Sequence, residues 1–233
     1  MIRALKPRVA SMNILLFGAS GMVGDGVVRW LVASPKVGRV VAVSRKPLSV
    51  QYPKLETVIE ADMFHLQNVD ALKDFDACFF CLGASSVGMS EEDYRRLTYD
   101  LTVAVARQLL PGNPRMIFEY ISGEGTDANS RQKWARVKAE TEAAVLNIGF
   151  RGAYAIRPGF IQPIRGVTSR IRSVRWMYAL TAPVYPVLQK AFGRWVMSTD
   201  LLAAAMLHLA EVGSKKKALN TGELNALARQ SGG

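Results

Sequence analysis

The sequence has few cysteines, few histidines and no long hydrophobic run, and each absence excludes a class of protein. Its two cysteines, Cys78 and Cys81, exclude a disulfide-stabilised secreted domain, and we expect a cytoplasmic protein. Spanning a bilayer takes roughly 20 consecutive apolar residues, which no segment provides. No group of His, Cys, Asp and Glu has metal-ligand spacing, so we predict no metal ion. The two cysteines lie inside an apolar run, which favours buried, inert thiols over a redox pair.

Acidic residues are absent from 143–199, in a chain whose formal net charge is +11. Such a basic stretch can attract an anionic substrate, or dock on a membrane or an acidic protein through residues 165–195. An ordinary solvated basic face is the alternative. Nucleic acid is not expected, because no helix-turn-helix, zinc or RNA-binding pattern accompanies the charge. The cations of this stretch are Arg151, Arg157, Arg165, Arg170, Arg172, Arg175, Lys190 and Arg194.

Apolar β-rich runs alternate with helical periods, which is typical of parallel strands joined by crossover helices. We predict one α/β domain over residues 1–233, with a basic, flexible extension at 1–12 that lacks the apolar core of a secretory signal. After Pro158 the alternation lapses, so we expect 159–197 to form a small C-terminal substrate-pocket or lid segment. The expected strands are 13–17, 39–43, 56–60, 77–82, 116–121 and 153–157, and the expected helices are 22–33, 90–110 and 131–146.

Three glycines open the first predicted helix directly after the first predicted strand. In a dinucleotide-binding turn, Gly18 would permit the tight turn, Gly21 would let N–H groups approach a pyrophosphate, and Gly24 would let helix and strand pack closely. The helix N-terminus adds partial positive charge for the phosphates. A merely structural turn is the alternative. The pattern predicts a Rossmann-type doubly wound sheet whose cofactor contacts include Gly18, Ser20, Gly21, Met22, Val23 and Gly24.

The end of the second predicted strand indicates which dinucleotide binds. No Asp or Glu occurs between Gly26 and Lys54, and the strand ends in Ser44, Arg45 and Lys46. A carboxylate there would bind the ribose hydroxyls of NAD, whereas an arginine accepts the 2′-phosphate of NADP. We therefore predict NADP over NAD, with a solvent-facing arginine as the alternative. Further contacts are expected after the third and fourth strands, at Asp62, Met63, Leu82, Gly83 and Ala84.

Four motifs together resemble the short-chain dehydrogenase/reductase superfamily, in its atypical and extended branch. This branch includes NAD(P)-binding epimerase-like proteins and NmrA-like and Tat-interacting-protein-like reductases. The resemblance covers nearly the whole chain and implies that the last motif shapes a turn beside the nicotinamide through its backbone. The motifs are G-A-S-G-M-V-G at 18–24, Cys81-Leu82-Gly83, Ile121-Ser122 and Arg157-Pro158-Gly159.

The same resemblance implies a catalytic Ser, Tyr and Lys, of which one is missing here. Ser122 matches the serine and Lys138 the lysine that holds the ribose, but Trp134 stands at the tyrosine position. An indole has no titratable proton near neutral pH, so it cannot replace a phenol in acid/base work. Lys138 could itself transfer the proton, or Glu124 or Tyr120 could have taken the role.

Two functions follow from this pattern. The first is an NADP-dependent atypical oxidoreductase or epimerase-like enzyme, with a small-molecule substrate, anionic as one option, bound between Ser122, Lys138 and residues 158–195. The alternative is a catalytically silent NADP(H)-binding sensor or assembly protein, which Trp134 favours.

Overall fold

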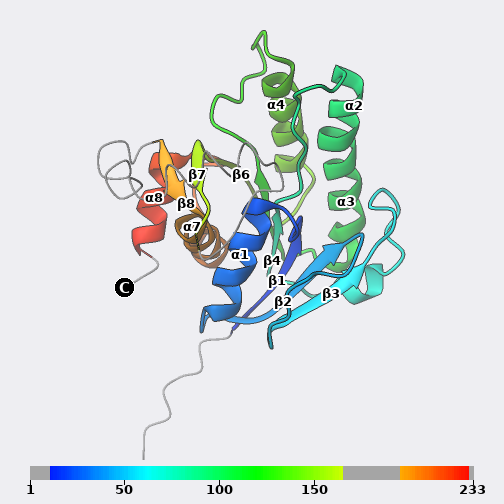
Figure 1. Ribbon diagram of the computed structural model, residues 1–233, viewed down its shortest axis with the longest axis vertical. Helices are drawn as coiled ribbons and strands as arrows, with labels where there is room; N and C mark the ends of the chain where they lie inside the picture. The colour runs from blue at the N-terminus through cyan, green and yellow to red at the C-terminus, as the bar shows by residue number, and fades with distance from the viewer. Residues whose placement is uncertain (1–10, 165–194, 231–233) are drawn as a thin grey trace, which may run out of the picture.

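The computed structural model describes residues 11–164 and 195–230. Within these ranges the chain folds into a parallel seven-stranded sheet with helices on both faces (Figure 1). The strand order is β3-β2-β1-β4-β5-β6-β9. These strands are β1 Met12–Phe17, β2 Val37–Ser44, β3 Leu55–Ile59, β4 Ala77–Phe80, β5 Ile117–Ile121, β6 Gly152–Arg157 and β9 Ala218–Asn220. This is the doubly wound architecture that the alternation of apolar runs predicts.

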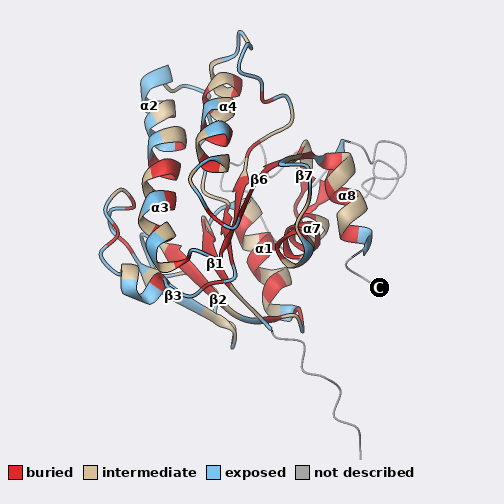
Figure 2. Cartoon of the chain, turned by 180° about the vertical axis from the view of Figure 1, so that it is seen from behind, coloured by how far each residue is buried: buried red, intermediate tan, exposed pale blue. Residues whose placement is uncertain are grey.

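Alternate residues of the central strand β1 enter two separate hydrophobic cores. Ile14 and Leu16 pack beneath helices α1, α7 and α8, whereas Leu15 and Phe17 pack against α3 and α4. Both faces of the strand are therefore buried, which is why its sequence is apolar throughout rather than alternating (Figure 2). The helices are α1 Met22–Ala33, α2 Glu91–Arg95, α3 Leu101–Leu109, α4 Lys133–Leu146, α7 Thr199–Val212 and α8 Thr221–Gln230.

The helix expected over 90–110 is divided into segments. Ser90 caps α2 by accepting a hydrogen bond from the Asp93 N–H at 3.0 Å. A π-helical turn, η2 (Arg96–Asp100), then separates α2 from α3. Two short 3₁₀ turns complete the connections, η1 at Val69–Leu72 and η3 at Leu110–Gly112.

The ends of the expected substrate segment form a small second sheet. Strand β7 (Phe160–Gln162) pairs in parallel with β8 (Val196–Ser198). Residues 165–194, which hold most of the predicted basic docking surface, lie outside the described residues, as do 1–10 and 231–233. The flexible extension predicted for 1–12 is wrong at Met12, which begins β1. None of the helices in 11–164 and 195–230 is long and apolar enough to cross a membrane.

Candidate active site

The glycine turn between β1 and α1 is built by two close backbone approaches. Gly18 has φ +87°, and a Cβ atom there would lie 2.7 Å from the Cys81 carbonyl carbon. A Cβ at Gly24 would lie 2.2 Å from the Gly18 carbonyl oxygen. The turn closes through the Gly21 N–H, which donates to the Gly18 carbonyl at 2.9 Å. Only glycine fits at Gly18 and Gly24, and the first N–H groups of α1 are left without intrahelical partners.

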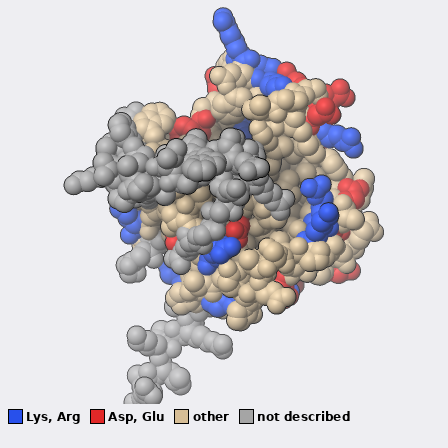
Figure 3. All heavy atoms as spheres, viewed as in Figure 1, with Lys and Arg blue, Asp and Glu red and all other residues tan. Residues whose placement is uncertain are grey.

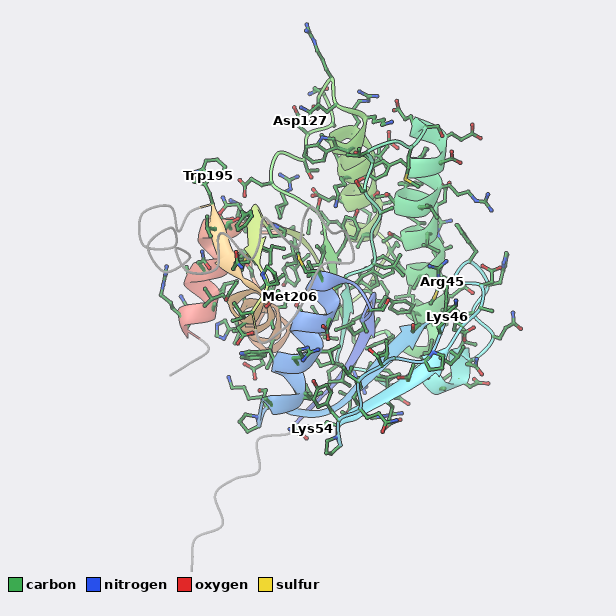
Figure 4. All side chains as sticks on the ribbon, viewed as in Figure 1. Arg45, Lys46, Lys54, Asp127, Trp195 and Met206 are labelled. Atoms are coloured by element: carbon green, nitrogen blue, oxygen red, sulfur yellow. The ribbon has the colours of Figure 1, made fainter. Side chains whose placement is uncertain are left out.

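Two basic side chains lie at the carboxyl end of β2, the strand beside β1. Arg45 and Lys46 are exposed, and neither forms an ion pair with the residues that the structure describes (Figure 4). The Ser44 hydroxyl donates to the Lys46 carbonyl at 2.8 Å and so fixes this turn. Lys and Arg side chains gather at this side of the molecule (Figure 3). The strand end therefore presents positive charge beside the glycine turn.

The residues expected after β3 serve partly to hold their own loop. The Asp62 carboxylate accepts from the Phe64 N–H and contacts His65 Nδ1, both at 2.8 Å, and these partners lower the pKa of Asp62. The Met63 side chain is buried in the core. No sequence pattern marked Glu60, which is buried. Its carboxylate accepts hydrogen bonds from the N–H groups of Gln67 and Asn68 at 3.0 and 2.7 Å. The predicted contacts of Asp62 and Met63 with a cofactor stay predictions.

The chain after β4 runs past the glycine turn. Its first residues, Leu82 and Ala84, are half-buried, and Gly83 between them is exposed with no atom within 4 Å of a Cβ built on it. The thiols in and after β4 face the interior instead, where burial raises the pKa of both Cys78 and Cys81. Gly83 is therefore exposed, with open space beside it, just beyond the carboxyl end of β4.

Ser122 and Lys138 come together at the end of β5. Lys138 projects from α4, and its ammonium donates to the carbonyl of Ser122 at 2.9 Å and of Ile121 at 3.4 Å. Burial lowers the pKa of Lys138 to about 8. The Ser122 hydroxyl is buried and lies 3.0 Å from the Thr126 hydroxyl. The fold therefore brings together the two residues that the family resemblance implied, while their catalytic roles stay predictions.

Trp134 lies over the loop that follows Ser122. A Cβ built on Gly125 would be 3.4 Å from the far edge of the indole, and one on Gly123 would be 3.9 Å from it. The indole N–H donates to the Gln132 side chain. Trp134 thus occupies the side of α4 that faces this loop, but it offers only a ring and a non-titrating N–H there.

The two other proposed proton donors are engaged elsewhere. Tyr120 is buried in the core, where desolvation raises its pKa, so the hypothesis that it replaces the missing phenol is wrong. The Glu124 carboxylate accepts from the Thr221 hydroxyl at 3.3 Å and from its N–H at 3.5 Å. Glu124 therefore ties the loop to the start of α8.

The turn after β6 is held from two sides. Arg157 binds Glu142 of α4 through two nitrogens, at 2.9 and 2.5 Å. The Pro158 carbonyl accepts from the Glu124 N–H at 3.0 Å, and the Gly159 N–H donates to the Thr221 hydroxyl at 2.7 Å. The Gly159 N–H is therefore already hydrogen-bonded within the protein, and contact between this turn and a cofactor stays a prediction.

A cavity of about 610 Å³ lies at the opposite, amino edge of the sheet. It is lined by residues that precede the strands, such as Met12, Asp76, Arg115 and Arg151. None of the predicted cofactor or catalytic residues lines it, so it is separate from the candidate active site. Among the described residues, no three His, Cys, Asp and Glu side chains are grouped so that they could hold a metal ion.

Comparison with solved structures defines the class of fold. The enzyme WbmF of Bordetella bronchiseptica, in complex with NAD⁺, superimposes with a TM-score of 0.65 and 16% identity over 96% of this chain and 78% of that chain. A short chain dehydrogenase from Burkholderia cenocepacia, in complex with NADP, gives a TM-score of 0.63 and 15% identity over 96% and 92%. The chain therefore shares a Rossmann-like α/β fold with these two proteins, as the alternation of apolar runs predicted.

Proteins of similar sequence have names that state a location but no activity. The chain is 28% identical to "Protein fmp52, mitochondrial" of Emericella nidulans over 223 residues, which is 92% of this chain and 91% of that protein. It is also 28% identical to "Protein fmp52-1, mitochondrial" of Aspergillus oryzae over 84% and 85%. No protein-family model matches.

The names of these relatives contradict the expected cytoplasmic location. That expectation depended on the low number of cysteines. The two cysteines, one buried and one partly buried, are both free thiols, and free thiols do not distinguish one reducing compartment from another.

Proposed function

We propose that this protein binds NADP(H) at the carboxyl edge of the sheet and acts as an oxidoreductase or epimerase-like enzyme. The observation that carries the proposal is the pairing of a glycine turn, closed by Gly18 and Gly24, with exposed Arg45 and Lys46 on the adjacent strand end. A helix N-terminus and a free guanidinium offer sites for the pyrophosphate and the 2′-phosphate respectively.

Each predicted residue has a role that its position supports. The N–H groups of Met22 and Val23, in the first turn of α1, would hold the pyrophosphate. Arg45 would bind the 2′-phosphate, with Lys46 adding charge and Ser44 fixing the turn. The two carbonyl contacts of Lys138 leave one ammonium hydrogen, which would go to the ribose in a binding role or to the substrate in catalysis.

The chemistry would depend on Lys138, because no phenol occupies the usual place. NADPH supplies a hydride when bound. The Lys138 ammonium, with a pKa near 8, could donate the balancing proton to a substrate oxygen close to neutral pH. Ser122, fixed by Thr126, would orient that oxygen. A small-molecule substrate between these residues and 158–195, with an anionic group as one option, completes the proposal.

Arg45→Ala is expected to weaken NADPH binding by about tenfold to a hundredfold, since one charge-assisted contact to phosphate contributes roughly 1.5–3 kcal/mol. NADH, which has no 2′-phosphate, should lose little. Calorimetric titration of both dinucleotides into both proteins at fixed salt measures this. Lys54→Ala is the matched control, because Lys54 donates to the Ser34 carbonyl at 2.7 Å, far from the β2 end (Figure 4). Equal losses for NADPH and NADH would contradict the assignment.

A second candidate is NADP(H) binding without turnover, as a sensor or assembly protein. Trp134 favours it, because the indole covers the loop after Ser122 without offering an exchangeable acid. The commitment of Lys138 to two backbone carbonyls also favours it. A docking role for residues 165–195, on a membrane or a protein, would belong with this candidate.

Two variants separate the candidates. NADPH oxidation would be followed with a panel of aldehydes, ketones and quinones. If the protein is an enzyme that uses Lys138, the wild-type protein should oxidise NADPH with at least one of these substrates. Lys138→Ala should then lower kcat by about a hundredfold or more. If it only binds, the wild-type protein should be inactive, and Trp134→Tyr should create measurable reductase activity by restoring the phenol.

A further inference from the structure

We infer that Glu142, clamped by Arg157, is a positioning residue that keeps the Lys138 ammonium charged and directed at the end of β5. The inference rests on the proposed function for the role of Lys138. It does not depend on which dinucleotide binds.

The geometry places one carboxylate between two cations. Glu142 follows Lys138 by four residues on α4, so the two side chains leave the same face of the helix one turn apart. Glu142 is only 4% exposed. Arg157 enters from β6 and binds the carboxylate through Nε at 2.9 Å and Nη2 at 2.5 Å. This bidentate contact fixes the direction of the Glu142 carboxylate.

Burial makes the charge of Glu142 matter to Lys138. The ammonium is desolvated beneath the loop, where it contacts two carbonyl oxygens and faces the Tyr120 ring, whose centroid is 5.6 Å from Nζ. Desolvation alone favours loss of the proton, and the negative charge of Glu142 opposes it. The carboxylate thus keeps a partly buried lysine able to act as an acid near neutral pH.

Other charged and titratable groups surround this site. These groups must keep the same charge in every variant, because a change in any of them could shift the titration midpoint of Lys138. They are Tyr120 of β5, Tyr94 of α2, Arg157 of β6, and Glu124 and Asp127 of the loop before α4.

A purely structural reading treats the Glu142–Arg157 pair as a brace between α4 and β6. That reading predicts loss of stability in either single variant and no ordered change at Lys138. The positioning role predicts shifts of opposite sign, because removing the carboxylate leaves two neighbouring cations, whereas removing the guanidinium leaves an unbalanced anion beside Lys138.

The test is an NMR titration of the full-length protein labelled with ¹³C at lysine Cε, without any cofactor. The Lys138 signal is identified by its absence in Lys138→Arg. Glu142→Gln should lower the titration midpoint by about one pH unit, and Arg157→Met should raise it. Glu140→Gln is the control: it lies on the same helix but pairs with Arg95 at 3.2 Å, and its midpoint should not change.

An unchanged midpoint in Glu142→Gln, or shifts of the same sign in Glu142→Gln and Arg157→Met, would overturn the inference. Urea unfolding of each variant shows that it is folded under the titration conditions. If opposite shifts occur but NADPH does not bind, the proposed function fails and the coupling of Glu142 to Lys138 stands. If Glu142→Gln does not fold, the upward shift in Arg157→Met still decides the result.

Discussion

Gly24→Ala is expected to abolish NADPH binding and to lower the free energy of unfolding by about 3 kcal/mol, at the upper end of overpacking costs. The added methyl group would lie 2.2 Å from the Gly18 carbonyl oxygen, and both atoms belong to rigid parts of the turn. Relief requires α1 to move away from β1, which would displace the N–H groups proposed to hold the pyrophosphate. Urea unfolding and calorimetric NADPH titration measure the two effects.

Gly83→Ala is the matched control for the stability measurement. A Cβ at Gly83 meets no atom within 4 Å, so the variant should be as stable as the wild-type protein. It should nevertheless bind NADPH more weakly, if the chain after β4 runs along the cofactor as proposed. Full NADPH affinity in Gly24→Ala would show that the turn is structural and would remove the main support for a dinucleotide site.

The elements that the sequence predicted best are those in which local chemistry and burial agree. Helix α1 occupies 22–33, as predicted, because the glycine turn fixes its start and Ser34 in an extended conformation ends it. The strands β1, β2, β4 and β5 are apolar on both faces, so burial and sequence give nearly the same boundaries. Predictions at this level depend on residues that are close together in the chain.

The features that were missed depend on partners that are far apart. Glu142 and Arg157 meet across 15 residues and Glu124 and Thr221 across 97, and no period or motif marks either pair. The strands β7, β8 and β9 have three residues each, which is too short for an alternating pattern to be recognised. Tyr120 was a reasonable acid from its place two residues before Ser122, but its ring is packed in the buried core that also holds residues of α3.

Strand β5 also holds a buried carboxyl that no motif marked. Glu119 has no exposed surface, and both its oxygens lack a hydrogen-bond partner within the described residues. It lies in register with Phe79 of β4 and Tyr154 of β6. Burial raises the pKa of Glu119 well above its ordinary value, so the folded protein holds this proton to a higher pH than the unfolded chain does.

This carboxyl should make the protein less stable as the pH rises. Above the ordinary glutamate pKa of about 4.5, the unfolded chain releases the Glu119 proton while the folded protein retains it. The contribution of Glu119 to stability is therefore complete below that pH and declines by up to about 1.4 kcal/mol per pH unit until the folded protein also loses the proton.

Glu119→Gln is expected to remove this decline, because a neutral amide of similar shape does not titrate. Urea unfolding at pH 5, 6, 7 and 8 should show an advantage over the wild-type protein that grows with pH. Glu56→Gln is the control. Arg39 lowers the pKa of exposed Glu56, whose contribution is complete above the ordinary pKa of about 4.5, so the effect of this variant should stay constant between pH 5 and 8. A difference between Glu119→Gln and wild type that stays constant across the four pH values would mean that Glu119 is ionised in the folded protein. Glu119 would then need a cationic partner, and residues 165–194, which lie outside the described residues, contain six arginines and lysines.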